Sequence, residues 1–560
     1  MPTIDISLKD LSKLVGKEIT LENFEPEALL WIKGEIDGID GDNLKIDCKE
    51  SNRPDLWSTE GIARAVSPFY TKERGIRKYK VEDSDVYLHV DRSVDKIRPY
   101  ISAAIIEDIT ITDDLIKQLI QIQEKVTTTF GRKRKAAAIG IYDFDKMTPP
   151  ITYKAFKPTE LKFIPLGFTK EMTLKDILIH HPKGQEFAHL LTDFDKYPIV
   201  IDNKDIVASM PPVINSESTG KVTEKTKNLF IEVTGINLDD TQVALNIVVC
   251  ALADRGGKIK TVLVDYGEKH LRTPDFTPKR IKVKFTEIEK LTGMKLSLKE
   301  LKDLLEKQQY EVKKAKDCLE VEYPSYRQDI MHPVDVIEDI LISYGYNKVT
   351  PILANLATTG ELSPIEEFCE EIRELIPGFG AQELLNFTLT NKEILFKKMN
   401  LKEENCVEIA NPVSNKWTNL RNAIIPSLMD FLEHNTSQEY PQQVYEVGDI
   451  VIINDRAETK TDTRKHLAWA LADKEANFTK AKQIITYILT GLNIDFQIEE
   501  ESNDSFITGR CARIIANKKV LGYFGEIHPK VLQNFSIEFP ICALELDITE
   551  LFILKKWHST

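Results

Sequence analysis

Four carboxylates gather in one short stretch of the sequence, residues 326–346. Asp335, Glu338 and Asp339 are spaced i, i+3 and i+4, so a helix would place all three on one face. Asp329 comes just before that helix, on a segment expected to fold over the same face. Like charges this close repel one another, and a hard divalent cation with oxygen ligands removes the repulsion. The pattern predicts a Mg²⁺ site at these four residues.

The same carboxylates also have a simpler interpretation, as acidic residues that complement a helix dipole or form a solvated face. The neighbouring residues favour the metal, because an apolar stripe would fix the acidic face beside a packed core. Pro333 suits the first turn of the helix, and Gly345 suits its end. The expected stripe consists of Ile330, Val334, Ile337, Ile340 and Leu341.

A second group of polar side chains lies in residues 207–235, and it includes Ser209. A Pro-Pro pair predicts a rigid loop rich in hydroxyl and amide groups, and the strand that follows carries Glu232 and runs into Thr234. Hydroxyls, amides and one carboxylate form a pocket suited to reading a polar ligand and orienting a water. The segment contains no His or Cys nucleophile, so an ordinary loop and strand remain the alternative.

The elements that would position these groups predict a multidomain α+β protein. We expect a mixed α/β unit at residues 1–85, a larger α/β unit at 86–275, a small helical module with the acidic helix at 276–355, and an antiparallel sheet with covering helices at 356–560. At 560 residues, the chain should hold about three to five domains.

Several elements are predicted with definite bounds. Helices are expected at Leu8–Val15, Asp113–Phe130, Ile365–Ile376 and Ile425–His434. Strands are expected at residues 29–36, 100–106, 229–233, 383–391, 442–453 and 541–548.

The charge balance limits the partners of the chain. The formal net charge is −14, whereas a protein that holds nucleic acid by phosphate neutralisation alone would be basic. Any RNA contact must therefore be local or shared with a basic partner. The basic run Arg132-Lys133-Arg134-Lys135 is a candidate for such a contact, although such runs are more often simply solvated.

The cysteines and the apolar runs indicate a cytoplasmic protein without a membrane span. No cysteine belongs to a CxxC pair, so neither a disulfide framework nor a zinc site is indicated. No apolar run is long enough to cross a bilayer, and the N-terminus shows no secretory signal. The cysteines are Cys48, Cys250, Cys318, Cys369, Cys406, Cys511 and Cys542.

Taken together, these segments resemble the β subunits of phenylalanyl-tRNA synthetases over essentially the whole chain and in the same order. The length resembles the short form found in archaea and eukaryotes, without the additional tRNA-binding modules of the longer bacterial type. The most specific parts are SNRPDLWSTEGIAR at 51–64, MPPVINSE at 210–217, FIEVTG at 230–235, YRQDIMHPVDVIEDILISYGY at 326–346 and NPVSNKWTNLRNAIIPSL at 411–428.

The resemblance implies roles for the candidate residues. Asp329, Asp335, Glu338 and Asp339 match the family's Mg²⁺-binding positions. The unit at 86–275 resembles the family's editing domain, which hydrolyses tyrosine wrongly attached to tRNA(Phe). Its pocket residues correspond to Ser209, Glu232 and Thr234, with Glu replacing the Asp more usual in archaeal members at position 232.

The last domain resembles a class II synthetase core that has lost its chemistry. No Gly-x-Gly-x-x-Arg-like segment closes it, and the roughly dozen residues after the final strand are expected to leave no room for that motif's helix. The resemblance therefore implies that ATP and phenylalanine are handled by an α subunit, with this chain as a scaffold in an (αβ)₂ heterotetramer that binds tRNA(Phe). The alternatives are a chain that aminoacylates alone and an RNA-binding scaffold without editing activity.

Overall fold

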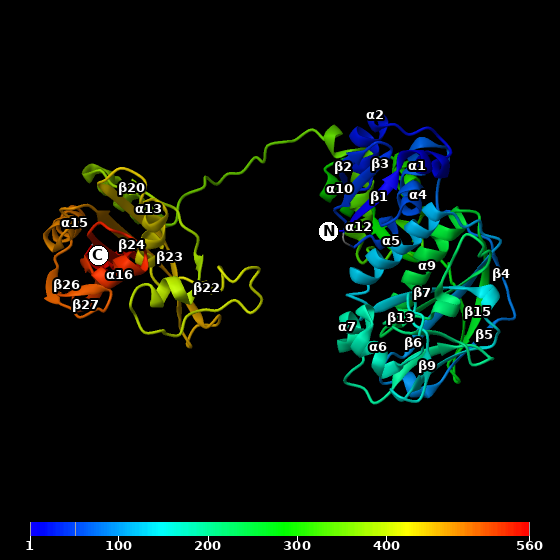
Figure 1. Cartoon of the computed structure of the whole chain (residues 1–560). Coiled ribbons are helices and arrows are strands. Elements are labelled where there is room, and N and C mark those ends of the chain that lie inside the picture. The colour runs from blue at the N-terminus through cyan, green and yellow to red at the C-terminus, as the bar shows by residue number, and fades with distance from the viewer. Residues whose placement is uncertain (1, 51, 559–560) are drawn as a thin grey trace. The chain divides into compact units, whose positions relative to one another are not determined.

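The computed structural model of the chain describes residues 2–50 and 52–558, so Ser51, the first residue of the motif at 51–64, lies outside the described residues. The chain forms two compact units, Met1–Leu353 and Ala354–Thr560, drawn from blue to green and from green to red in Figure 1. None of the helices among the described residues combines the length and apolar character that a membrane span requires.

The first unit begins with a three-stranded antiparallel sheet in the order β1-β3-β2. The predicted helix Leu8–Val15 is confirmed as α1, and Ser58 caps α4 by accepting a 3.0 Å hydrogen bond from the Gly61 amide. The elements of this part are β1 (Thr3–Ser7), α1 (Leu8–Val15), α2 (Leu21–Asn23), α3 (Leu29–Trp31), β2 (Gly34–Asp40), β3 (Asn43–Cys48) and α4 (Thr59–Tyr70).

The strand expected at residues 29–36 is wrong in its first half. Leu29–Trp31 is helical, and β2 starts only at Gly34. The reason is packing, because the Trp31 ring stacks on Phe69 of α4 with the centroids 3.7 Å apart and Leu29 is buried. A tertiary contact has here overridden the local alternation of the sequence.

An eleven-stranded sheet dominates the first unit. Its path runs β13-β12-β11-β8-β5-β15-β6-β14-β7, and β4 and β16 also pair with β15. The strands are β4 (Val81–Glu82), β5 (Tyr87–Val90), β6 (Tyr100–Glu107), β7 (Ala137–Asp143), β8 (Ile151–Phe156), β11 (Tyr197–Ile201), β12 (Val207–Met210), β13 (Ile214–Asn215), β14 (Leu229–Gly235), β15 (Lys258–Asp265) and β16 (His270–Thr273).

Helices cover this sheet, and a short separate hairpin lies beside it. α9 packs on β6, β14 and β7, and its apolar residues share one core with α5. The predicted helix at 113–130 is confirmed, although it ends at Thr128. The remaining elements are α5 (Asp113–Thr128), β9 (Lys162–Phe163), β10 (Met172–Thr173), α6 (Leu174–His180), α7 (Pro182–Phe187), α8 (Glu217–Gly220) and α9 (Leu238–Asp254).

The two ends of the sheet path come together in space. The helix α8 contacts both β12, near one end, and β7, at the other end. The side-chain amide of Asn215 on β13 also donates to the Ile141 carbonyl on β7, at 3.4 Å. These contacts connect the two ends of the sheet path. Residues on strands that are far apart along the path therefore lie close together there.

The last part of the first unit carries the acidic helix. β19 pairs with β17 and with β18, and α11 begins at a capping box formed by Ser297 and Glu300. Its elements are β17 (Lys279–Lys284), α10 (Phe285–Thr292), α11 (Leu298–Lys307), β18 (Glu311–Lys314), β19 (Cys318–Tyr323) and α12 (Pro333–Tyr344).

The acidic helix α12 has the predicted start and end, with Pro333 in its first turn and Gly345 as its C-cap. The predicted apolar stripe needs correction, because Val334 is exposed while Val336 is buried with Ile337 and Ile340. Val334 lies in the first turn of α12, ahead of the residues that pack on the core.

The second unit is built on a seven-stranded sheet in the order β20-β23-β24-β28-β27-β26-β25, antiparallel except for β20 with β23. Its strands are β20 (Gln382–Glu383), β21 (Leu389–Thr390), β22 (Asn419–Leu420), β23 (Gln442–Ile453), β24 (Thr461–Ala472), β25 (Gln497–Glu500), β26 (Phe506–Ala516), β27 (Lys519–Ile527) and β28 (Ile541–Asp547). Its helices are α13 (Pro364–Leu375), α14 (Ile425–His434), α15 (Phe478–Gly491), α16 (Pro529–Asn534) and α17 (Ile548–His558).

Two expectations about the second unit are wrong. The single strand predicted at 383–391 is reduced to β20 and β21, because the segment leaves the sheet where Asn386 reaches the buried Glu446, at 2.7 Å. A helix, α17, does follow the final strand. Its Leu551 is fully buried in the core, and Asp547 accepts a hydrogen bond from the Glu550 amide at the helix start.

Candidate functional site

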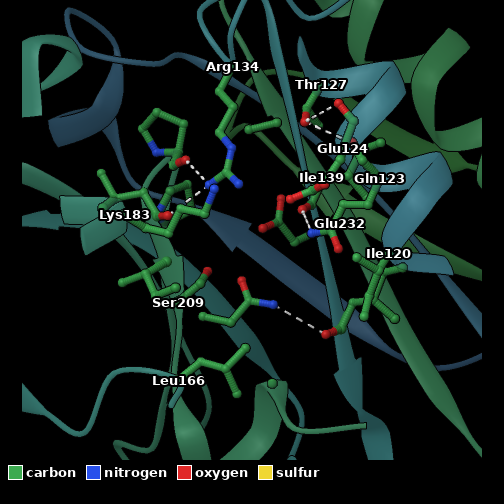
Figure 2. A pocket seen from close by; sticks show the side chains of 18 of the residues that line it. Ile120, Gln123, Glu124, Thr127, Arg134, Ile139, Leu166, Lys183, Ser209 and Glu232 are labelled. Carbon is green, nitrogen blue, oxygen red and sulfur yellow. Dashed lines mark hydrogen bonds between the residues drawn. The ribbon is translucent and has the colours of Figure 1, made fainter. Parts of the chain in front are cut away.

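A cavity of about 370 Å³ lies in the first unit, where the two ends of the large sheet meet (Figure 2). This volume falls in the range of small-molecule binding pockets. Apolar side chains from α5 and β7 form much of its wall, namely Ile116, Leu119, Ile120, Ile139 and Ile141. Polar groups come from β12, β13, β14 and the turn after α5, so the cavity combines an apolar wall with a few directed polar atoms.

Glu232 lies at the centre of β14 and lines this cavity. It pairs with Ala103 on β6 and Gly140 on β7, and its side chain is buried. Tyr142 Oη donates a 2.8 Å hydrogen bond to Glu232 Oε1. Burial raises the pKa of Glu232 to about 7, although the bond from Tyr142 and the charge of Arg98 act in the opposite direction.

Ser209 comes from β12, close to the opposite end of the sheet path, and lines the same cavity. Figure 2 shows its side chain and that of Glu232 on the two sides of the pocket. Ser209 Oγ and Glu232 Oε2 are both buried and make no hydrogen bond of ordinary geometry with the described residues, and Ser209 lies beside the Tyr142 hydroxyl. Because such buried atoms normally find a partner, the pocket has unused capacity for the polar atoms of a ligand.

Thr234, the third residue predicted for this site, is not among the lining residues. It is fully buried, and Arg98 Nε donates a 2.9 Å hydrogen bond to its hydroxyl. Arg98 also donates to the backbone carbonyls of Thr234 and Lys135. The structure thus brings Ser209 and Glu232 together. It places Thr234 beside them, where its hydrogen bond with Arg98 supports β14.

Sequence reasoning did not single out Tyr142 or Arg98, which contact the predicted residues. Both are buried polar side chains, and no local spacing relates them to Glu232. The basic run did contain a signal, because Arg134 lines the cavity and donates to the Pro212 and Val213 carbonyls, at 3.2 and 2.8 Å. Lys183 and Lys221 also line the cavity, which is therefore bordered by cations.

The four predicted metal-binding carboxylates also line one cavity, a small one of about 30 Å³. Its other charged residues are Glu50, Lys33 and Arg53, from the N-terminal part of the same unit. The tertiary structure therefore does bring together Asp329, Asp335, Glu338 and Asp339.

Protein groups already pair with the two most buried of these carboxylates. Arg327, itself buried, donates to Asp329 and Asp339 at 2.6 and 2.9 Å. Arg53 lies 3.8 Å from Asp329 and forms a closer pair, at 2.8 Å, with Asp55. The turn at Arg53 is thus held by an ion pair within the turn itself.

The other two carboxylates have weaker partners. Glu338, which is half exposed, pairs with Lys33 at 2.7 Å. Asp335 accepts hydrogen bonds from the amides of Met331 and His332, at 2.8 and 2.7 Å, and so stabilises the start of its own helix.

The donor set of this cavity suits a hard cation only in part. The lining carries five carboxylates and two cations, and carboxylate oxygen is the ligand that Mg²⁺ prefers. However, the described residues whose possible ligand atoms all lie within 4.8 Å of one another are Asp430, Glu433 and His434 on α14. The carboxylates of α12 do not form such a group. A metal at α12 would require Lys33 or Arg327 to release a carboxylate.

The second unit holds buried charges in place of a phosphate-binding loop. Arg421 and Glu446 form a fully buried pair, at 2.6 Å. Glu545 accepts hydrogen bonds from the Ile424 and Ile425 amides at the start of α14 and contacts the His466 ring, at 2.8 Å. Arg421 Nη1 is nevertheless buried without a hydrogen-bond partner among the described residues.

Three protein-family models match successive parts of the chain. A B3/4-domain model matches residues 90–248, a tRNA synthetase B5-domain model matches residues 281–346, and a phenylalanyl-tRNA synthetase β-chain CLM-domain model matches residues 350–548. The fold and these three matches define a subunit of an aminoacyl-tRNA synthetase.

Whole-chain relatives narrow the assignment. The chain is 47% identical over 556 residues to the phenylalanine–tRNA ligase β subunit of Pyrococcus horikoshii, covering 99% of this chain and 100% of that protein. It is 38% identical over 552 residues to the corresponding protein of Methanocaldococcus jannaschii, covering 98% and 100%. A crystal structure of an N-terminal fragment of the P. horikoshii β subunit, at 47% identity, matches with a TM-score of 0.60 and covers 62% of this chain and 100% of that fragment. The chain belongs to the phenylalanine–tRNA ligase β-subunit family, as the resemblance predicted.

Proposed function

We propose that this chain supports the attachment of phenylalanine to tRNA(Phe) by a catalytic α subunit and removes tyrosine that has been attached in error. The observation that carries the second activity is the pair of buried, unpartnered atoms, Ser209 Oγ and Glu232 Oε2, in one cavity with an apolar wall. An apolar wall suits an aromatic ring, and the free acceptor suits a phenolic hydroxyl.

The need for such a site follows from elementary energetics. A pocket shaped for an apolar ring cannot strongly reject the same ring with one added hydroxyl. A second pocket that hydrogen-bonds this hydroxyl discriminates far better, because its buried polar groups stay unpaired when phenylalanine enters. Glu232 Oε2 would accept the tyrosine hydroxyl, and the ionised carboxylate is the stronger acceptor.

The reaction in this proposal is the hydrolysis of one ester. The oxygen of a water bonds to the carbonyl carbon that joins tyrosine to the terminal ribose, the bond from that carbon to the ribose oxygen breaks, and a water proton passes to the ribose oxygen. Ser209 and the side-chain amide of Asn215, which also lines the cavity, are the groups available to orient the ester and the water. Thr234, bonded to Arg98, would keep β14 in register.

Deacylation of tyrosyl-tRNA(Phe) by the full chain, alone and with the α subunit, tests this assignment. Glu232→Ala should abolish most of the activity, whereas Glu124→Ala is the matched control, because Glu124 also lines the cavity but is exposed. Unchanged deacylation in Glu232→Ala would contradict the editing assignment and leave a tRNA-binding scaffold as the remaining function.

The scaffold role concerns the second unit. Its largely antiparallel sheet with covering helices resembles a class II synthetase core, and α17 follows β28 without a Gly-x-Gly-x-x-Arg-like segment. We therefore place ATP and phenylalanine on the α subunit, in an (αβ)₂ heterotetramer. Phenylalanine-dependent ATP–pyrophosphate exchange should appear only when the chain is mixed with a cognate α subunit, and exchange by the chain alone would refute a non-catalytic second unit.

Mg²⁺ is proposed for the small acidic cavity beside α12. The half-exposed Glu338, with Glu50 and Asp335, offers the accessible oxygens, because Asp329 and Asp339 are held by the buried Arg327. Such a metal would stabilise the junction between α12 and the N-terminal sheet. A thermal melt with and without a chelator should show a lower Tm without Mg²⁺; an identical Tm would mean that Lys33 and the arginines suffice.

A further inference from the structure

The turn between α5 and β7 has an unusual backbone. Arg132, Lys133 and Arg134 have φ values of 50°, 52° and 67°, and they form the only run of three non-glycine residues in the left-handed region within the described chain. This region is sterically unfavourable for residues with a Cβ and favours glycine, asparagine or aspartate. Backbone strain of this kind persists where the surrounding structure holds it and often marks a functional segment.

A set of backbone hydrogen bonds holds the turn in this shape. The amides of Arg132, Lys133 and Arg134 donate to the carbonyls of the last turn of α5, at 3.1, 2.9 and 2.8 Å, and the Ala136 amide donates to the Gly131 carbonyl, at 2.8 Å. Glycine would adopt this conformation without strain. The sequence nevertheless places three long cationic side chains there, so the backbone alone does not account for the residue types.

Arg134 anchors the turn to the pocket. Its guanidinium donates to the carbonyls of Pro212 and Val213 and lies over the Phe187 ring, 4.2 Å from the ring centroid. Figure 2 shows this side chain at the edge of the cavity opposite Ser209. The neighbouring residues of the turn are consequently fixed beside the same pocket.

The other cations of the turn are free to bind an anion. Arg132, Lys133 and Lys135 are exposed, and none of them forms an ion pair with a described residue, although the charge of Arg132 acts on the nearby Asp240. Lys183 and Lys221, which also line the cavity, each pair with a nearby glutamate, Glu186 and Glu217. In a chain with a net charge of −14, an unpaired group of cations beside a pocket is a local exception to the charge balance.

We propose that the left-handed turn Arg132–Lys135 binds phosphates of a single-stranded RNA end whose terminal aminoacyl group enters the cavity. Arg134 positions the turn, while Arg132 and Lys133 contact the phosphates. The inference rests on the proposed editing function, because that function supplies an RNA with an esterified end. The new part of the inference is that this turn binds the RNA backbone, away from the ester that is hydrolysed.

The test is the salt dependence of binding of uncharged tRNA(Phe) to the full chain. Each phosphate contact to a single strand contributes about 0.7 to the slope of log K against log salt concentration. Arg132→Gly combined with Lys133→Gly should therefore lower the slope by roughly 1.4. Glycine keeps the left-handed backbone, so the double variant should fold, and Arg132→Gln with Lys133→Gln checks that lost charge is the cause.

A matched control comes from the same sheet domain. Lys157 and Lys204 are exposed, form no ion pair with a described residue and do not line the cavity, so their double Ala variant should keep the wild-type slope. An unchanged slope in both turn variants, an equal loss in the control, or no tRNA binding by the wild type would overturn the proposal. Binding with the expected slope by a wild-type chain that leaves tyrosyl-tRNA(Phe) intact would instead refute the editing function alone.

Discussion

Tyr142 and Glu232 lie on the neighbouring strands β7 and β14 and share a 2.8 Å hydrogen bond inside the pocket, with the phenol donating to Glu232 Oε1. Both side chains are buried, and the bond orients the carboxylate while leaving Oε2 without a partner among the described residues. A carboxyl with a pKa of about 7 in such a place changes its charge near neutral pH, and the effect on stability can be measured.

The first prediction concerns the free energy of unfolding of the chain. Glu232 has a raised pKa of about 7 in the folded chain, whereas an unfolded glutamate titrates near pH 4.3. The folded state therefore binds more protons between these values, and the free energy of unfolding should fall as the pH rises from about 4.3 to 7, by on the order of 3 kcal/mol. In Glu232→Gln this loss should disappear.

Urea denaturation of the wild type, Glu232→Gln and the exposed control Glu124→Gln at pH 5, 6, 7 and 8 would show the effect. The control should follow the wild type. Parallel pH profiles for the wild type and Glu232→Gln would mean that Glu232 has an ordinary pKa in the folded chain.

A second prediction concerns the unpartnered hydroxyl of Ser209. Removing a buried hydroxyl that makes no hydrogen bond should not destabilise the fold, and Ser209→Ala should change the free energy of unfolding by less than about 1 kcal/mol or raise it. Deacylation of tyrosyl-tRNA(Phe) should nevertheless fall. Ser216→Ala is the control, because Ser216 is equally buried but caps α8, and its loss should cost about 1 kcal/mol.

Chemical denaturation and single-turnover deacylation of the two serine variants separate these effects. A large loss of stability in Ser209→Ala would show that its hydroxyl is a structural group. Full deacylation by that variant would remove Ser209 from the site.

A third prediction concerns the buried pair of Arg421 and Glu446 in the second unit. Glu446 is fully buried, and it also accepts a 2.7 Å hydrogen bond from Asn386. Arg421→Met would leave a buried carboxylate without its cation and should lower stability by roughly 3–5 kcal/mol. Arg421→Met combined with Glu446→Gln should recover part of the loss.

Urea denaturation of the wild type, Arg421→Met, Glu446→Gln and the double variant measures this coupling in a double-mutant cycle. If the single variant loses less than the double variant, the pair does not stabilise the second unit. Fluorescence is a suitable probe, because Trp469 lies in the core of this unit.

A fourth prediction follows from His466. Burial lowers the pKa of this imidazole, but hydrogen bonds to Asp547 and Glu545 outweigh the effect and raise its pKa to about 9. The unfolded value is near 6.5, so the stabilisation is complete below that pH and is lost as the pH rises towards 9, by on the order of 3 kcal/mol. His466→Asn should flatten this part of the profile.

NMR titration of His466 gives the pKa directly, and urea denaturation of the second unit between pH 6 and 10 gives its effect on stability. A titration of His466 near its ordinary value would contradict the prediction.

Local sequence alone determined much of this protein. The bounds of α1, α14 and β23 follow from hydrophobic periodicity and caps, and the family follows from motifs that are contiguous in the chain. The placement of Asp335, Glu338 and Asp339 on one helix also needed only their spacing. These features depend on residues within a few turns of one another, so their physical causes are visible in the sequence.

The tertiary structure decided which groups meet. Ser209 and Glu232 lie on β12 and β14, with five strands between them along the sheet path, and they share a cavity only because the ends of that path come together. Arg327 reaches Asp339, and Arg98 holds Thr234, through contacts that no local spacing indicates. Pairing between distant strands and burial of charge depend on how the whole core packs, and therefore only the folded chain shows which carboxylates are satisfied and which remain free to bind a ligand.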